Sequence, residues 1–279
     1  MPNLLSEVFA RLKKPSPKEL GQVVVEIKKL QQHHGDTRSQ GYYDRLQRAS
    51  SWLAKAKQIV DDPEAQFIFL WIALNALCGV RYDVLKTAWW RNEERSRPTL
   101  YKEQGDDLVL RELEWFLWRV CGLDGSERTL RSVIEDHWPD VKTVIKARYI
   151  MSYYWNGSWR SEEDIDRRMK SSMRIVNEAI GLVSGGEKMY RALCEIIIWR
   201  LRTLRNQLFH GCATDAHSKR RAAGESELEA GSRLLEELIW AFLVLIAGES
   251  GRVSYWPPSP YPRAGSPQHQ PFDASWLPK

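Results

Sequence analysis

The sequence has few cysteines, and none of them lies in a pattern that forms a metal site or a redox centre. Only four occur in 279 residues, and no two form a Cys-x-x-Cys pair. They are Cys78, Cys121, Cys194 and Cys212. Because no secretion signal precedes them, they predict reduced thiols in a cytoplasmic protein. The spacing His210-x-Cys212 supplies two zinc ligands and no third at ligand spacing, so we expect no metal and no cofactor.

Several further signatures are missing. The chain has no glycine-rich phosphate loop, no nucleophile elbow and no internal repeat, which argues against P-loop nucleotide hydrolases, α/β-hydrolases and repeat proteins. Its most apolar run, at 67–79, is shorter than the roughly 20 residues that a membrane-spanning helix needs, so we expect no membrane partner. A net charge of +5 mildly favours an anionic partner such as nucleic acid.

Apolar residues recur at helical spacing along most of the chain, which predicts an all-α protein. We expect helices at about 18–34, 42–60, 63–79, 108–120, 130–138, 161–183, 187–210 and 226–248. The start of the third is the best defined of these, because Asp62 can cap it and Pro63 can open it.

The expected helical domain covers residues 1–249. Its core helices lie within about 42–79 and 187–248, and about 81–185 forms a helical insertion. Residues 250–279 hold seven of the 13 prolines, so they form no packed domain. We expect an irregular tail whose aromatic side chains dock on the chain's own helices or on a partner. Truncation at the start of this tail should leave the bundle folded.

The helix expected at 63–79 is apolar on all sides, which predicts a central position. We expect it to contact the helix at 187–210, because these two apolar elements must bury each other. Asn75 is the polar exception and needs a hydrogen-bond partner. That partner is either a neighbouring helix, in a structural role, or the pair Arg205 and His210, in a supporting role.

Candidate catalytic residues lie at the end of the helix expected at 187–210. Arg205, Asn206 and His210 occupy its last turns, and Gly211 can end it in the left-handed conformation. The helix dipole holds the pKa of His210 near neutrality, so this side chain can take and give a proton. Arg205 and His210 are about 140° apart on a regular helix, so either the last turn distorts or a second copy completes the site. The competing interpretation is ordinary compensation of the helix dipole.

The string from Arg205 to His210 resembles the Arg-Asn-x-x-x-His signature of the HEPN superfamily, and Gly211 fits its Apea-like branch. The run at 70–77 also resembles the equivalent core helix. The resemblance implies an antiparallel helical bundle and a metal-independent endoribonuclease. It further implies that the RNA 2′-hydroxyl attacks the neighbouring phosphate and that His210 moves the proton. Arg205 would stabilise phosphoryl charge, and Asn206 would orient His210 or the motif of a second subunit.

Basic side chains surround this motif. The stretch from 200 to 221 has six of them against one acid, Asp215. Besides Arg205 they are Arg200, Arg202, Lys219, Arg220 and Arg221. Such a surplus favours binding of RNA phosphates, although a solvated basic face is the alternative.

The resemblance also implies partners. Members of this kind serve as toxins or anti-phage defence effectors, so we expect a homodimer or dimer of dimers and an antitoxin or defence-complex protein. Members modified by a nucleotidyltransferase antitoxin often have Tyr where this chain has Cys212, which argues against that control. The alternative function is a non-catalytic HEPN-like module that binds nucleic acid or a nucleotide, or that dimerises within a larger complex. A helical scaffold that recruits a partner through its tail is a third.

Overall fold

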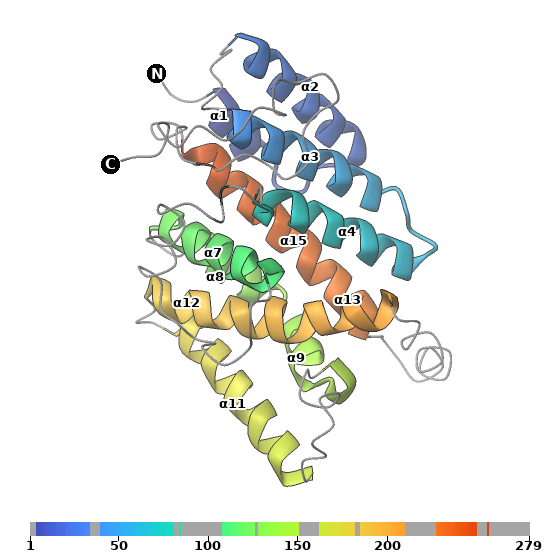
Figure 1. Cartoon of the computed structure of the whole chain (residues 1–279), viewed down its shortest axis with the longest axis vertical. Coiled ribbons are helices and arrows are strands. Elements are labelled where there is room, and N and C mark those ends of the chain that lie inside the picture. The colour runs from blue at the N-terminus through green and yellow to red at the C-terminus, as the bar shows by residue number, and fades with distance from the viewer. Residues whose placement is uncertain are drawn as a thin grey trace. The chain divides into compact units, whose positions relative to one another are not determined.

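The computed structural model consists of helices (Figure 1). The residues it describes are 4–33, 40–80, 84, 108–125, 128–150, 162–181, 185–209, 227–249 and 256. Within these ranges every regular element is a helix and no strand occurs, so the all-α prediction is confirmed there.

The chain divides into two compact units. Unit 1 consists of residues 1–58, 72–116 and 242–279, and unit 2 of residues 59–71 and 117–241. The boundary expected after residue 249 stays a prediction.

The helices are distributed over both units. Unit 1 contains α1 (Leu4–Arg11), α2 (Pro17–His33), α3 (Gln40–Ala56) and parts of α4 (Pro63–Cys78), α7 (Leu108–Leu123) and α15 (Glu227–Gly248). Unit 2 contains the remaining parts of those last three helices. It also contains α8 (Arg128–Asp136), α9 (Trp138–Lys146), η1 (Arg148–Ile150), α11 (Glu162–Ile180), α12 (Gly186–Leu193), η2 (Cys194–Leu201) and α13 (Arg202–Phe209).

Unit 1 has an aromatic core that includes one residue of the proline-rich tail. Trp256 is 3% exposed and packs edge-on against Trp115, with ring centroids 5.9 Å apart. Its indole nitrogen donates to Glu249 Oε2 at 2.9 Å, and the guanidinium of buried Arg45 lies 5.8 Å from its ring. The docking expected of the tail's aromatic residues is therefore present at Trp256. Truncation at Ser250 would remove this core side chain, and the expectation that the bundle stays folded without the tail stays a prediction.

In unit 2, the helix expected at 130–138 corresponds to α8, and a further helix that the sequence analysis did not predict, α9, follows it directly after His137. Asp124 caps the start of α8, since its carboxylate accepts the backbone N–H of Leu130 at 2.9 Å. Pro139 lies in the first turn of α9, where its missing N–H is harmless. The break between α8 and α9 is thus confined to His137.

The part of α4 in unit 2 begins as expected. Asp62 Oδ1 accepts the backbone N–H of Ala65 at 3.0 Å, and the helix starts at Pro63. Further along, α4 packs against α15 and η2 at Gly231. A Cβ added to Gly231 would lie 3.1 Å from Leu201 Cδ2 and 3.5 Å from Phe67 Cε2. The absent side chain therefore permits this close approach.

Candidate functional site

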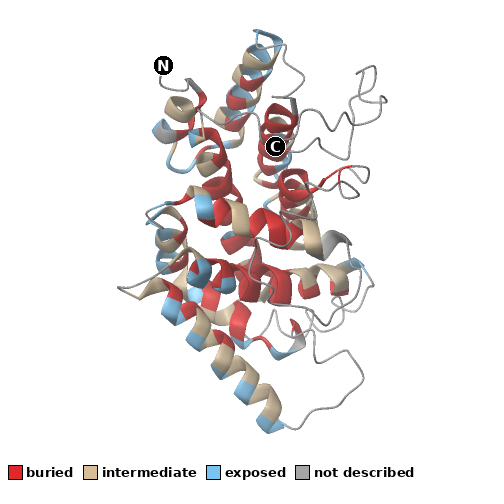
Figure 2. Cartoon of the chain, turned by 60° about the vertical axis from the view of Figure 1, so that its left-hand side comes forward, coloured by how far each residue is buried: buried red, intermediate tan, exposed pale blue. Residues whose placement is uncertain are grey.

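The expected helix 187–210 is a succession of three segments, α12, η2 and α13, that follow each other as one long stretch (Figure 1). η2 is a π-helix of eight residues, and the Arg202 N–H at its end donates to the Ile197 carbonyl, five residues earlier. All eight residues of η2 are buried, whereas α13 has exposed and half-buried positions (Figure 2). The motif therefore follows directly after an enclosed π segment, a feature that often marks functional sites.

The π geometry places residue i+5 beside residue i, which brings Glu195 and Arg200 to the same side of η2. Both face Ser172 of α11. Glu195 Oε2 accepts from Ser172 Oγ at 2.8 Å, and Arg200 Nη2 donates to the same Oγ at 3.4 Å. Glu195 Oε1 also accepts from Arg168 Nη2 at 2.7 Å. A buried ionic network of this kind is stable only when its charges are hydrogen-bonded, and both carboxylate oxygens of Glu195 accept a hydrogen bond here.

The RNA-binding role expected of Arg200 is corrected by this network. Arg200 is 1% exposed, and its Nε donates to the Ile145 carbonyl at 3.3 Å. A guanidinium enclosed in this way has no surface to offer a phosphate. The apolar run 196–199 that precedes it is the signal in the sequence for a segment buried on every side.

Arg205 is half-buried on α13 and is held by three neighbours. Its Nη1 donates to Asn206 Oδ1 at 2.8 Å. Its Cζ lies 4.7 Å from the ring centroid of Phe209 and 6.0 Å from that of Trp71 in α4, both within cation–π range. The contact expected between helices 63–79 and 187–210 is confirmed by this pair. The guanidinium therefore has a defined position at the end of α13.

Sequence reasoning missed both aromatic neighbours of Arg205. Phe209 follows Arg205 by four residues, a spacing that places two side chains together on a helix, so its role was readable. It is also 57% exposed, so its ring is accessible to a ligand. Trp71 comes from another helix, and nothing in the sequence near Arg205 indicates that the two side chains lie together.

No protein-family model, curated protein or solved structure matches this chain. The site is therefore defined by the geometry of its own residues.

The other expected site residues divide into two groups. Arg202 is half-buried in the first turn of α13. His210, Lys219, Arg220 and Arg221 lie outside the described residues. The structure thus places Arg205 and Asn206 together, and their relation to His210 stays a prediction.

Asn75, expected in a supporting role, is a half-buried residue of unit 1. Its backbone carbonyl accepts the N–H of Gly79 at 2.9 Å and the Cys78 thiol at 3.9 Å. Burial raises the pKa of the Cys78 thiol to about 12, so this cysteine is an unreactive packing residue. A contact from Asn75 to Arg205 or His210 stays a prediction.

A second polar cluster joins α9 to α15. Asp140 Oδ1 accepts from Arg233 Nη2 at 2.6 Å, and Asp140 Oδ2 lies 2.9 Å from His137 Nδ1. Burial acts to raise the pKa of Asp140, but the hydrogen bonds from Arg233 and His137 outweigh it and hold that pKa below its usual range. This cluster connects two helices of unit 2.

Among the described residues, no group of three or more His, Cys, Asp or Glu side chains is arranged to hold a metal ion. None of the helices that the structure describes is both long and apolar enough to cross a membrane.

Proposed function

We propose that this chain is a metal-independent endoribonuclease of the HEPN type, with Arg205, Asn206 and His210 as its catalytic residues. The observation that supports the proposal is the fixed position of the Arg205 guanidinium. It is bound to Asn206 and lies over two aromatic rings at the helix end that leads to His210. A cation ordered before its ligand arrives loses little conformational entropy when a phosphate binds.

The reaction needs one proton transfer and charge stabilisation. The RNA 2′-oxygen forms a bond to the neighbouring phosphorus, and the bond from phosphorus to the 5′-oxygen breaks. His210 moves the proton between these oxygens. Arg205 stabilises the negative charge on the phosphoryl oxygens, a role that suits a planar guanidinium because it stays charged and can pair with two oxygens. No step requires a metal ion.

The exposed ring of Phe209 extends this proposal to the RNA bases. Its ring lies 4.7 Å from the Arg205 guanidinium, so a phosphate bound at Arg205 would bring the adjoining nucleotide close to it. Proteins that bind single-stranded RNA stack unpaired bases on such rings. Half-buried Arg202 and the basic residues Lys219, Arg220 and Arg221 would bind further phosphates.

The active species in this proposal is a homodimer or a dimer of dimers. Arg205 and His210 diverge by about 140° on a regular helix, so one α13 directs them poorly at a single phosphate. In an isologous interface, Arg205 of one protomer can lie beside His210 of its partner. The biological role would be that of a cytoplasmic toxin or anti-phage effector, together with an antitoxin or defence-complex protein.

The competing function is a non-catalytic module that binds nucleic acid. It is favoured by the aromatic packing of Arg205, because two cation–π contacts also give this residue a structural role.

Cleavage of single-stranded RNA in excess EDTA by the purified full chain decides between these functions. The wild type should cut, and His210→Ala should lose the activity while it keeps its melting temperature. The control is Arg191→Ala, which removes an exposed arginine of α12 that pairs with Glu187. RNA binding without cleavage by the wild type would instead identify the non-catalytic module.

Mixing two inactive variants tests the shared site. Under conditions of subunit exchange, Arg205→Ala and His210→Ala should together recover cleavage, since each heterodimer contains one intact composite site. A wild-type monomer that cuts RNA would rule out the dimeric site.

A further inference from the structure

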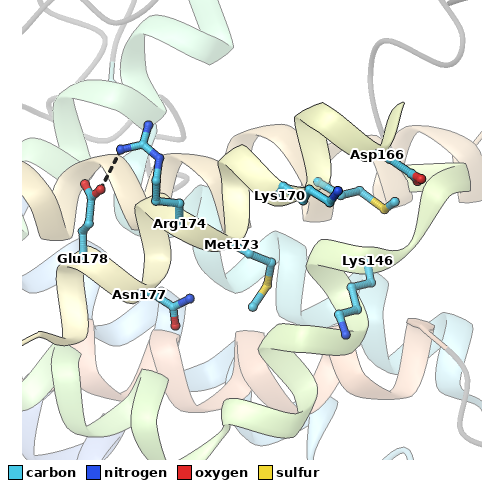
Figure 3. Close-up of a pocket in the computed structure, with 8 residues that line it drawn as sticks. Lys146, Asp166, Lys170, Met173, Arg174, Asn177 and Glu178 are labelled. Carbon is cyan, nitrogen blue, oxygen red and sulfur yellow. Dashed lines mark hydrogen bonds and ion pairs between the residues drawn. The ribbon is translucent and has the colours of Figure 1, made fainter. Parts of the chain in front are cut away.

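A groove in unit 2 lies between the end of α9 and one side of α11 (Figure 3). Its volume is about 680 Å³, within the range of about 300–1,000 Å³ that is typical of small-molecule sites. It is lined by Lys146, Asp166, Met169, Lys170, Met173, Arg174, Asn177 and Glu178. None of these residues belongs to the site proposed for RNA.

The position of the groove follows from the two sides of α11. Ser172, Val176 and Ala179 form its buried side. The lining residues recur at spacings of three and four from 166 to 178, so they form a separate stripe of about 18 Å along the helix. Met173 and Asn177 point toward α9, from which Lys146 comes (Figure 3).

The lining atoms are mostly apolar. Met169 and Met173 provide flexible, polarizable side chains that adapt to irregular apolar ligands. The aliphatic stems of Lys146 and Lys170 can extend the apolar surface while their ammonium groups remain at its edge. Asn177 adds an amide that can both donate and accept a hydrogen bond.

The acidic side chains of the groove have basic partners, and its two lysines differ from them in this respect. Asp166 pairs with Arg148 at 3.2 Å, and Glu178 pairs with Arg174 at 2.6 Å. For Lys146 and Lys170, no acidic partner is seen among the residues that the structure describes. A ligand with a negative group would therefore complement the two lysines, while the acids are already engaged.

We propose that this groove binds an amphipathic small anion, in which an apolar chain lies on Met169 and Met173 and an anionic head group pairs with Lys146 and Lys170. An extended chain of about ten carbons is shorter than the stripe of about 18 Å, so it fits along the groove. The inference stands independently of the proposed ribonuclease activity.

Titration of the full chain with decanoate, followed by calorimetry, tests the proposal. We expect one site per chain and a Kd on the order of 100 µM, as for a small, partly buried ligand. The double variant Lys146→Gln/Lys170→Gln should bind decanoate about tenfold more weakly, since hydrogen bonds to two charged groups are lost. Both substitutions are on the surface of the groove, and circular dichroism with thermal melting verifies the fold.

Two controls separate charge recognition from simple adsorption. Lys142→Gln changes a lysine of α9 that is directed over the Trp138 ring and does not line the groove, so its affinity should stay within about twofold of the wild type. Decanol has the same chain without the charge. It should bind the wild type and the double variant equally, and more weakly than decanoate binds the wild type.

Three results would overturn the proposal. The first is the absence of saturable decanoate binding at millimolar concentration. The second is binding that the double substitution leaves unchanged. The third is saturable binding of an acidic amphipathic helical peptide without binding of decanoate, which would assign the groove to a protein partner.

Discussion

Arg200 and Arg205 are five residues apart on one helical stretch, yet their surroundings are opposite. Arg200 is 1% exposed in η2 and donates to Ser172 and Ile145, in a network with Glu195. Arg205 is half-buried in α13, where its partners are Asn206 and two aromatic rings. The comparison shows that burial decides the role of a basic residue near a motif. A buried guanidinium, such as that of Arg200, is committed to hydrogen bonds within the fold. A guanidinium that is fixed by its neighbours but still accessible, such as that of Arg205, can bind a ligand.

The largest effect should come from replacing Arg205, and it should be on the rate of RNA cleavage. Arg205→Ala should lower the rate of RNA cleavage by about 10²–10³-fold, as loss of a group that stabilises transition-state charge does. Its stability should fall by only about 1–2 kcal/mol, the value of its cation–π contacts. Cleavage rates and urea unfolding measure the two quantities.

Arg200→Ala should show the reverse pattern in the same assays. Its unfolding free energy should fall by about 3–5 kcal/mol, because Ser172 Oγ and the Ile145 carbonyl lose a buried donor and the missing side chain leaves a cavity. Any remaining folded protein should cut RNA at the wild-type rate. A folded, stable Arg200→Ala protein without activity would contradict the comparison.

Glu195→Ala measures how much the buried carboxylate of the same network contributes to stability. We expect a loss of about 3–5 kcal/mol, since Arg168 would be left without its buried carboxylate and the Ser172 hydroxyl without its acceptor. The matched control is Glu187→Ala, which breaks an exposed pair with Arg191 and should cost about 0.5 kcal/mol or less. Chemical denaturation of both variants provides the values.

Trp256 provides a neutral reference for the cost of losing a buried side chain. Trp256→Ala should destabilise unit 1 by about 3–5 kcal/mol, as for other large aromatic truncations. A chain that ends at Glu249 should lose at least this amount, because it lacks Trp256, the tail residue that the structure describes and places in the core. A truncated chain with the wild-type melting temperature would show that this packing contributes nothing.

The smallest effect is expected at the partly exposed cluster of Asp140, His137 and Arg233. The folded-state pKa of Asp140 is depressed, so its stabilising contribution is present above the ordinary pKa near 3.8 and is lost as the pH falls through the folded value. Asp140→Asn should therefore be less stable than the wild type at pH 7. It should also lose less stability between pH 5 and pH 2. Melting temperatures over that range provide the test.

The features that the sequence predicted correctly depend on neighbouring residues. Asp62 and Pro63 define the start of α4 because capping and proline geometry act within one turn. The apolar face of the motif helix was likewise readable from its period, and Leu193, Ile197, Leu201 and Leu204 are buried.

The features that it did not predict depend on distant contacts. The residues of 194–201 carry no local signal that distinguishes a π-helix from an α-helix, and their polar side chains bind atoms of α11 and α9 that are distant in the sequence. Trp256 lies in a segment whose composition indicates disorder, yet Trp115 and Arg45 provide a place for its ring. The sequence predicted an RNA-binding role for Arg200 from its charge, but the charge of a residue does not indicate whether its side chain is buried.

The π segment also sets the angular phase between α12 and the motif. A π-helix turns less per residue than an α-helix, so the same eight residues closed as an α-helix would rotate everything after η2 about the helix axis relative to α12. The string from Arg205 to His210 would be unchanged in such a protein, but the direction of Arg205 relative to Trp71 would differ. A comparison of motifs alone would not reveal this difference.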